Sequence, residues 1–198
     1  RKDKILVTEN IDNVSDINQF VAIVYKNLDT ANKVKTINIP SVIVPYTSHI
    51  EESDILVLNP SGLVNILYKN NHTHNTLFVT DRCNSNCLMC SQPPRDKDDI
   101  DYYYNINMQT IPLLPKNIEQ LGVTGGEPTL LNDKLRDMIW LFHKELPESS
   151  MHILSNGRAF AWKNFTEKFD SINHSKLIFG IPLYSDYAPQ HDYIVQAK

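Results

Sequence analysis

Three cysteines, the only ones among the 198 residues, lie close together as Cys83, Cys87 and Cys90. Thiolates are soft ligands that suit iron–sulfur clusters as well as zinc. A compact CxxxCxxC run supplies three ligands, so one iron of a four-iron cluster would keep a position without a protein ligand. An open iron is a position where a second molecule can bind and react. The spacing therefore predicts a redox-active iron–sulfur centre.

Structural zinc is the alternative reading of the same cysteines. His72 and His74 lie a few residues upstream and could supply a fourth ligand. Zinc sites usually take their cysteines as CxxC pairs from two separated loops, which a single triplet does not match. A disulfide framework is disfavoured because three cysteines would leave one thiol over. A non-enzymatic zinc-binding interaction module remains the alternative from another functional class.

A second motif, Gly125-Gly126-Glu127-Pro128, ends an apolar run further along the chain. Glycine has no Cβ, so the backbone of Gly125 and Gly126 could approach a bound molecule closely, and Glu127 could bond an ammonium group. Ser155-Asn156-Gly157 ends the next apolar run. Ordinary turns would explain both motifs as well, since Asn-Gly and Gly-Gly pairs favour turns. The motifs gain weight only together with the cysteines.

Strands and helices are expected to alternate from residue 76 onward. Helices are indicated after Asn132, where an apolar stripe runs to Pro147, and around Trp162–Phe169. This alternation is typical of βαβ units and a parallel sheet, in which ligands gather at the carboxyl ends of the strands. The cysteine loop and both glycine-containing motifs should therefore meet at one edge of the sheet. The expected strands are Leu77–Thr80, Ile118–Thr124, Met151–Leu154 and Leu177–Leu183.

Residues 1–75 are expected to form a small α+β accessory domain without chemistry of its own. Ile5–Val7 is a strand candidate, and Asp54–Leu58 with Leu63–Tyr68 flank a good turn sequence and predict a β-hairpin. Ser15 is placed to begin a helix. The apolar positions that would share one face of that helix are Ile17, Phe20, Val21, Val24 and Leu28.

Composition excludes several classes of function. The formal charge is −4, from 19 basic and 23 acidic residues, and no basic run indicates a nucleic-acid partner. No stretch is apolar and long enough to span a membrane. The lack of a signal peptide, together with three free thiols, predicts a reducing, cytoplasmic location. The acidic stretch Arg95–Asp101 is expected to be a solvated loop.

The cysteine run and the Gly-Gly-Glu-Pro motif, in this order and each at a strand end, resemble the radical S-adenosylmethionine (SAM) superfamily. The resemblance implies an α/β fold with a partial (β/α) barrel, of whose six strands four are visible in residues 76–198. It also implies that a reduced 4Fe–4S cluster cleaves SAM to a radical that abstracts hydrogen from the substrate. The implied ligands of the cluster are Cys83, Cys87 and Cys90, and the implied contacts to SAM are Met89, Gly125, Gly126, Glu127, Ser155 and Asn156.

A finer resemblance is to a maturase of the His-Xaa-Ser peptide system. It is based on Thr76–Asn84, on Cys87–Pro94 and on the hairpin Asp54–Gly62. This resemblance implies a ribosomally made precursor peptide as substrate and an electron-donor protein of the flavodoxin or ferredoxin type. A second maturase of the same system is a further partner in this reading. The alternative within the superfamily is an enzyme acting on another protein or on a small molecule.

Neither resemblance indicates which residue acts on the substrate. Residue 1 is Arg rather than Met, and the chain stops directly after the helix-like run His191–Lys198. We therefore expect the core domain, residues 76–198, to be truncated at its C-terminus.

Overall fold

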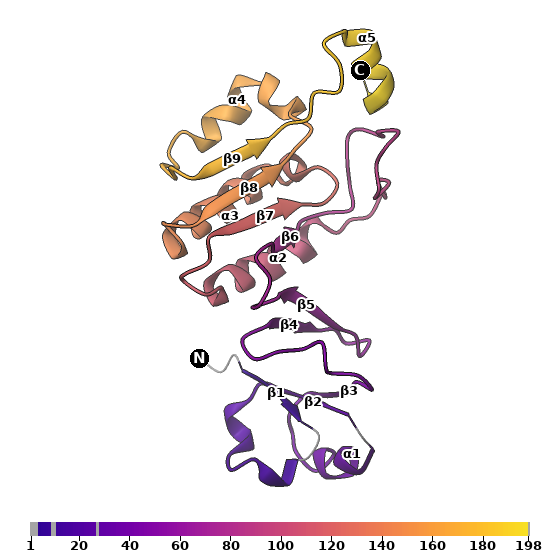
Figure 1. The fold of residues 1–198 in the computed structure, drawn as a ribbon, viewed down its shortest axis with the longest axis vertical. Helices are drawn as coiled ribbons and strands as arrows, with labels where there is room; N and C mark the ends of the chain where they lie inside the picture. Colours follow the sequence, from indigo (N-terminus) through magenta and orange to yellow (C-terminus); the bar gives the residue numbers. More distant parts are fainter. Residues whose placement is uncertain (1–3, 9–10, 27, 198) are drawn as a thin grey trace. The chain divides into compact units, whose positions relative to one another are not determined.

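The computed structural model describes residues 4–8, 11–26 and 28–197 and divides the chain into two compact units, Arg1–Asn70 and Asn71–Lys198 (Figure 1). Each unit combines a parallel β-sheet with helices. The predicted mixed α/β class is therefore confirmed. Within the second unit, four parallel strands form the largest sheet.

A three-stranded parallel sheet with β2 at its centre forms the core of the first unit. Ile23 and Val24 of the central strand have no exposed surface. Ile23 packs with Ile11 and Val34, which come from the segments on either side of β2. The elements of this unit are β1 (Ile5–Thr8), η1 (Ile11–Asn13), η2 (Ile17–Gln19), β2 (Ala22–Tyr25), α1 (Leu28–Val34), β3 (Ser41–Ile43), β4 (Ile55–Leu58) and β5 (Val64–Tyr68), η marking a 3₁₀-helix.

The helix predicted to begin at Ser15 is wrong. Only the single 3₁₀ turn η2 forms there, with Asp16 rather than Ser15 accepting the capping hydrogen bond from the Asn18 N–H, at 3.0 Å. Of the apolar residues that follow, Phe20 and Val21 precede strand β2, and Val24 lies in it. A central parallel strand is buried on both faces and reads as a continuous apolar run, which a helical stripe can imitate over a short window.

The predicted β-hairpin is confirmed, since β4 and β5 pair antiparallel. Its turn is closed by the Gly62 N–H, which donates to the Asn59 carbonyl at 2.9 Å. Gly62 has φ +85°, a conformation that glycine adopts without strain. The base of the hairpin is fixed by Asp54, whose buried carboxylate pairs with the Lys69 ammonium at 2.8 Å.

The second unit has the strand order β6-β7-β8-β9, and all three strand pairs are parallel. The four predicted strands are confirmed, although β9 ends at Gly180 rather than at Leu183. The elements are β6 (Thr76–Phe78), α2 (Ile100–Thr110), η3 (Ile111–Leu113), β7 (Gln120–Thr124), η4 (Pro128–Leu131), α3 (Asp133–Glu145), β8 (Ser150–Leu154), η5 (Arg158–Ala161), α4 (Lys163–Thr166), η6 (Glu167–Phe169), β9 (Leu177–Gly180) and α5 (Ala188–Val195).

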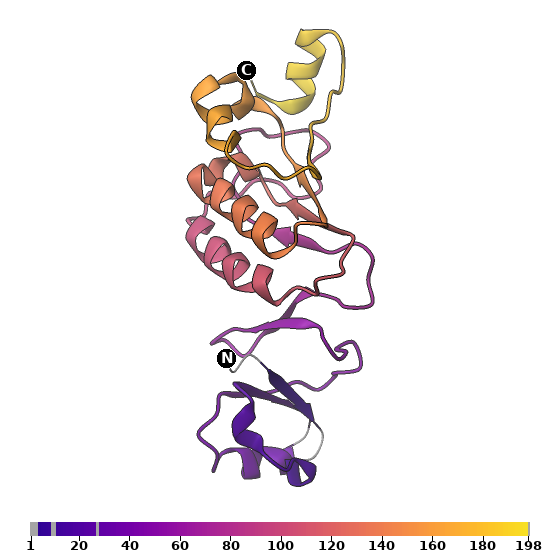
Figure 2. The same cartoon turned by 90° about the vertical axis from the view of Figure 1, so that its left-hand side faces the viewer.

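Helices α2, α3 and α4 lie on the same face of this sheet (Figure 2). Successive side chains of a strand point to opposite faces, and in β8 Met151 and Ile153 are fully buried whereas His152 and Leu154 are exposed. The apolar stripe predicted for the helix after Asn132 is confirmed. Its buried members are Leu135, Met138, Ile139 and Phe142 in α3, followed by Leu146.

Two predicted helix starts need correction. The side chain of Asn132 does not cap α3, because its backbone has φ +54° and its amide oxygen accepts a hydrogen bond from Lys168 instead. Helix α5 begins at Ala188, earlier than the run from His191 suggested, with Pro189 in its first turn, where proline is tolerated. Within residues 4–8, 11–26 and 28–197, the structure contains no helix with the length and apolar character needed to cross a membrane.

His174, in the turn before β9, is a buried histidine with partners on both ring nitrogens. Its Nε2 lies 2.9 Å from the Ser149 carbonyl oxygen, and its Nδ1 lies 3.2 Å from Nδ1 of His143. This geometry suits a neutral ring that donates from Nε2 and accepts at Nδ1. Burial lowers the pKa of His174 below its ordinary value of 6.5; His143 and Lys176 lower it further, against the opposing effect of the hydrogen bond to Ser149.

The stability of the second unit should therefore fall as the pH falls below 6.5. In that range the unfolded chain takes up a proton that the folded protein resists. Both tryptophans, Trp140 and Trp162, lie in this unit, so their fluorescence can follow its unfolding in urea between about pH 7.5 and about pH 5.5. The slope against pH should flatten in His174→Gln and persist in the control His72→Gln, which changes an exposed histidine. A wild-type slope in His174→Gln would contradict the assignment.

Candidate functional site

The three cysteines lie in a long loop between β6 and α2, beyond the carboxyl end of the sheet (Figure 1). The base of this loop is closed by Asp99. Its carboxylate accepts a hydrogen bond from the Thr80 hydroxyl at 2.6 Å and another from the Asp81 N–H at 2.9 Å. The Arg95 N–H also donates to the Asp81 carbonyl, at 3.0 Å. The two ends of the loop are thereby held together.

The expectation that Arg95–Asp101 is a solvated loop is wrong for Asp99, which is only 9% exposed. Asp99 directly precedes α2, a position where aspartate commonly caps a helix, but here the structure shows no side-chain capping bond. The available sequence signal was an aspartate at the last position before a helix, in a stretch with three further aspartates. Its partners Thr80 and Asp81 could be found only from the fold.

Replacing Asp99 by Ala should loosen the cysteine loop. Two buried or half-buried donors would lose their acceptor, and each unsatisfied group costs about 1–3 kcal/mol. The matched control is Asp98→Ala, which removes the same charge from the adjacent, exposed position. Urea unfolding followed by tryptophan fluorescence should show a loss for Asp99→Ala alone. Equal stability of the two variants would contradict the role given to Asp99.

Helix α5 holds the other side of the cysteine loop. The N–H groups of Asn86 and Leu88 donate to the carbonyls of Val195 and Ile194, at 3.1 and 2.9 Å. These carbonyls lie at the C-terminal end of α5, where helical carbonyls lack partners within the helix. The loop therefore satisfies the end of the helix, and the helix fixes the backbone on both sides of Cys87.

The remaining part of the loop is more open. Cys87 is half-buried, whereas Cys90 is exposed and its thiol donates to the Gln92 carbonyl at 2.9 Å. A turn joins the two cysteines, since the Cys90 N–H donates to the Cys87 carbonyl at 3.0 Å. Leu88 and Met89 between them are exposed. Met89 takes no part in the hydrogen bonds by which Glu127 and Asn156 join the strand ends to the cysteine loop.

The glycine motif at the end of β7 packs directly against the start of the cysteine loop. The Gly126 N–H donates to the Thr80 carbonyl at 2.7 Å, and the Glu127 N–H donates to the Arg82 carbonyl at 2.8 Å. A Cβ added to Gly126 would lie 1.9 Å from the Arg82 carbonyl oxygen, and one added to Gly125 would lie 2.7 Å from that of Thr80. Gly125 also has φ +145°. The chain's own backbone is therefore what requires glycine at both positions.

Glu127 has no exposed surface, and its carboxyl group joins the ends of β7 and β8. One oxygen accepts hydrogen bonds from the Thr129 N–H at 3.0 Å, the Thr129 hydroxyl at 2.6 Å and the Ser155 hydroxyl at 2.7 Å. The other oxygen accepts from the Asn156 N–H at 2.7 Å. These four contacts hold the Glu127 carboxyl group between the two strand ends, while its expected contact to an ammonium group stays a prediction.

Asn156 extends this connection to the cysteine loop. Its side-chain amide donates to Asn84 Oδ1 at 2.6 Å and to the Ser85 hydroxyl at 3.3 Å, and its nitrogen lies 3.9 Å from the Cys83 sulfur. Arg158, from the same strand end, donates to the Asn84 carbonyl. The structure therefore brings Cys83, the glycine motif and Ser155–Asn156 together, as expected for one edge of a parallel sheet.

The surroundings of the Cys83 thiol shift its pKa upward. Burial raises the pKa of Cys83, and the nearby Glu127 and Cys87 raise it further. Hydrogen bonds from the Ser85 N–H and from Asn156 oppose this rise. Metal binding requires a deprotonated thiol, so a metal ion would have to displace this proton.

The donor set fits an iron–sulfur cluster in kind, since one loop supplies three soft sulfur ligands and all three thiols are free. In the part of the chain that the structure describes, no three His, Cys, Asp or Glu side chains are grouped so as to hold a metal ion. The sulfurs would have to converge by movement of the open part of the loop. Of the two upstream histidines proposed as a fourth zinc ligand, His74 has its Nδ1 2.6 Å from the side-chain nitrogen of Gln120.

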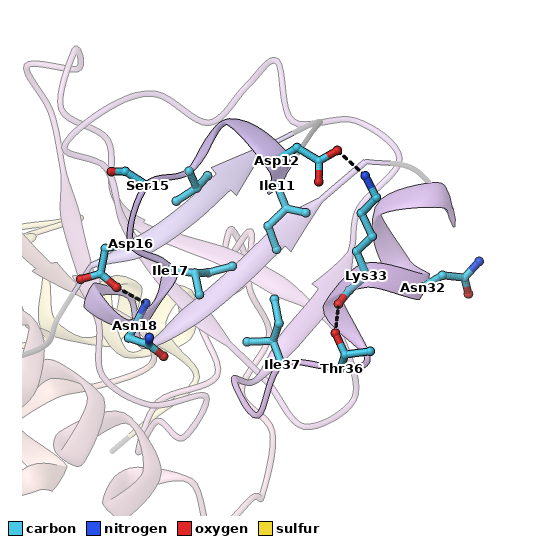
Figure 3. A pocket seen from close by; sticks show the side chains of 11 residues that line it. Ile11, Asp12, Ser15, Asp16, Ile17, Asn18, Asn32, Lys33, Thr36 and Ile37 are labelled. Carbon is cyan, nitrogen blue, oxygen red and sulfur yellow. Dashed lines mark hydrogen bonds and ion pairs between the residues drawn. The ribbon is translucent and has the colours of Figure 1, made fainter.

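A separate hollow of about 680 Å³ lies in the first unit (Figure 3). It is lined by residues of η1, η2 and α1 and by the segment that follows α1. Figure 3 shows that its polar side chains pair within the rim, Asp12 with Lys33 and Asp16 with the backbone of Asn18. These groups already satisfy one another, and nothing in the arrangement indicates chemistry.

Comparison of the chain with models of known protein families gave no match, and comparison with curated proteins gave none either.

Proposed function

We propose that this chain is a radical SAM enzyme whose site lies at the carboxyl edge of the four-stranded sheet. The observation that supports the proposal is the meeting of three loops there. One contains the cysteine triplet, one the Gly-Gly-Glu-Pro motif and one Ser155–Asn156, and Glu127 and Asn156 join them by hydrogen bonds. In parallel sheets this edge is where ligands bind.

In this proposal Cys83, Cys87 and Cys90 hold a 4Fe–4S cluster. When bound, the cluster supplies one electron for the reductive cleavage of SAM, which starts hydrogen abstraction from the substrate. The protein contributes position. Asp99 and helix α5 fix the cysteine loop at its base and at one side, so that only its tip must close on the metal.

The contacts to SAM are assigned to the strand ends beside the cysteine loop. The backbone around Gly125 and Gly126 lies against residues 80–82. We assign the methionine end of SAM to this backbone. Ser155 is 4% exposed and bonded to Glu127, so its expected role becomes one of support. Met89 is exposed at the tip of the loop, where closure could bring it to the adenine.

The fold around this site is proposed to be part of a (β/α) barrel. The support is the run of four parallel strands with helices on one face, and the exposure of His152 and Leu154 on the other. In a barrel that second face would be the interior. Residues 1–75 are proposed as an accessory domain, for which no chemical role is suggested.

For the substrate, we propose a ribosomally made precursor peptide of the His-Xaa-Ser type, with a flavodoxin or ferredoxin as electron donor. The support is the resemblance of Thr76–Asn84 and Cys87–Pro94 to that group of maturases. Another protein or a small molecule is the alternative substrate. A zinc-binding module would use the same three cysteines with His72 or His74 as fourth ligand, and it stays the alternative from another functional class; the contact of His74 with Gln120 counts against His74 as that ligand.

The test is SAM cleavage by anaerobically reconstituted protein. With dithionite as reductant, the wild-type protein should release 5′-deoxyadenosine and methionine, which chromatography measures without knowledge of the substrate. Protein treated with zinc in place of iron and sulfide is the control and should release neither. Cleavage absent from iron-loaded protein with a fully assembled cluster would contradict the proposed activity.

A further inference from the structure

We infer that Asn156 is a positioning residue for Cys83: its side-chain amide donates a hydrogen bond to the Cys83 sulfur when the cluster is bound. This inference rests on the proposed function and deepens it. It assigns Asn156 to the cluster side of the site, whereas its sequence motif suggested a contact to SAM.

Three contacts of one amide group support the inference. The Asn156 nitrogen lies 3.9 Å from the Cys83 sulfur, 2.6 Å from Asn84 Oδ1 and 3.3 Å from the Ser85 oxygen. The three partners are consecutive residues at the start of the cysteine loop. Ser85 is 6% exposed and Cys83 is half-buried, so the amide reaches the enclosed end of the loop rather than its open tip.

The orientation of Asn156 is fixed by bonds that do not involve the cysteine loop. Its backbone N–H donates to the buried Glu127 carboxyl at 2.7 Å, and its side-chain oxygen accepts from the Arg158 N–H at 3.1 Å. The oxygen and the backbone are thus engaged elsewhere, and the NH₂ group faces the start of the cysteine loop. Its two hydrogens have three acceptors there, so the bond to the Cys83 sulfur requires the hydrogen of the 3.3 Å contact to turn from the Ser85 hydroxyl to the sulfur. Rotation of the Cys83 side chain alone could shorten the contact, since a thiolate is a better acceptor than a thiol.

A hydrogen bond to a ligating sulfur has a measurable consequence. Hydrogen bonds to the sulfurs are among the factors that set the reduction potential of an iron–sulfur cluster. The reduced cluster is the more negative form, so an N–H directed at a sulfur favours it. Loss of the Asn156 donor should therefore lower the midpoint potential.

Two substitutions remove the donor, and only Asn156→Ala also removes the oxygen that accepts from the Arg158 N–H. Asn156→Asp keeps an oxygen for the Arg158 N–H and replaces only the NH₂ group, while it adds a negative charge. Asn156→Ala removes the donor without adding charge. Both keep the backbone bond to Glu127, so both should fold. The control is Asn86→Ala, an exposed asparagine in the same loop, which contacts α5 through its backbone N–H.

The readout is the midpoint potential of the cluster reconstituted with iron and sulfide, measured by a redox titration followed by EPR. We expect a lower potential in Asn156→Ala, a still lower one in Asn156→Asp, and the wild-type value in Asn86→Ala. Wild-type potentials in both Asn156 variants would overturn the inference and leave the proposed function standing. An equal shift in Asn86→Ala would also overturn it, whereas a wild-type protein that assembles no cluster would overturn the proposed function itself.

Discussion

Replacing Gly126 by Ala or Val is expected to disrupt the cysteine loop itself. The added Cβ would lie 1.9 Å from the Arg82 carbonyl oxygen and 2.4 Å from the Arg82 carbonyl carbon. Both atoms are backbone, so no change of side-chain rotamer can relieve the collision. Overpacking of this kind costs about 3 kcal/mol or more when the backbone must move. The Gly126 and Glu127 backbone bonds to Thr80 and Arg82 would be lost with that movement.

The measurements are urea unfolding and iron content after anaerobic reconstitution. Both should fall in Gly126→Ala and further in Gly126→Val, because the displaced carbonyl directly precedes Cys83. Gly122→Ala is the matched control, since the three atoms nearest to its added Cβ all belong to the side chain of Thr76, the nearest at 2.9 Å. From the sequence alone we would expect a loss of SAM binding with the cluster intact. Normal iron content in Gly126→Val would contradict the packing role of Gly126 and favour a direct contact of Gly126 with SAM.

Replacing Glu127 by Leu is expected to have a comparably large effect. The substitution would leave four donors without an acceptor, two on Thr129, one on Ser155 and one on Asn156. An unsatisfied buried donor costs about 1–3 kcal/mol, so the sum should exceed the effect of any single surface change. The connection between the ends of β7 and β8 would be lost, and with it the support of Asn156.

Glu127→Gln provides the graded comparison. It keeps the shape and one oxygen, so most of the donors retain a partner, and its loss of stability should be clearly smaller than that of Glu127→Leu. Unfolding in urea, followed by fluorescence of Trp140 and Trp162, measures both. If Glu127→Leu were as stable as the wild type, the carboxyl group would not have the structural role assigned here.

The strands of the second unit could be predicted because each is a short apolar run between turn residues. The segment from Ser15 to Leu28 could not, because apolar residues at Ile17, Val21 and Val24 fit a helical stripe as well as a buried strand. Only the pairing of β2 with strands on both sides decides between the two readings. The pattern of a doubly buried strand has no period of its own.

The residue types and motifs of the sequence were enough to find the residues of the candidate site, but they did not predict which partners these residues bond. Glu127 bonds to residues 28 and 29 positions away, and Asn156 to residues more than 70 positions away. No local pattern encodes such contacts. The same is true of Asp99. The sequence groups it with three aspartates of an expected solvated loop, but in the fold its carboxylate accepts a hydrogen bond from the Thr80 hydroxyl.

The most direct measurement of the central claim is the iron and sulfide content of the anaerobically reconstituted chain, together with its EPR spectrum after reduction. The wild-type protein should be brown, contain about four iron and four sulfide per chain and show the signal of a reduced 4Fe–4S cluster. The variant with Cys83, Cys87 and Cys90 all replaced by Ala should contain neither iron nor sulfide. A triple variant that keeps iron, sulfide and SAM cleavage, or a wild-type protein that binds only zinc, would contradict the account.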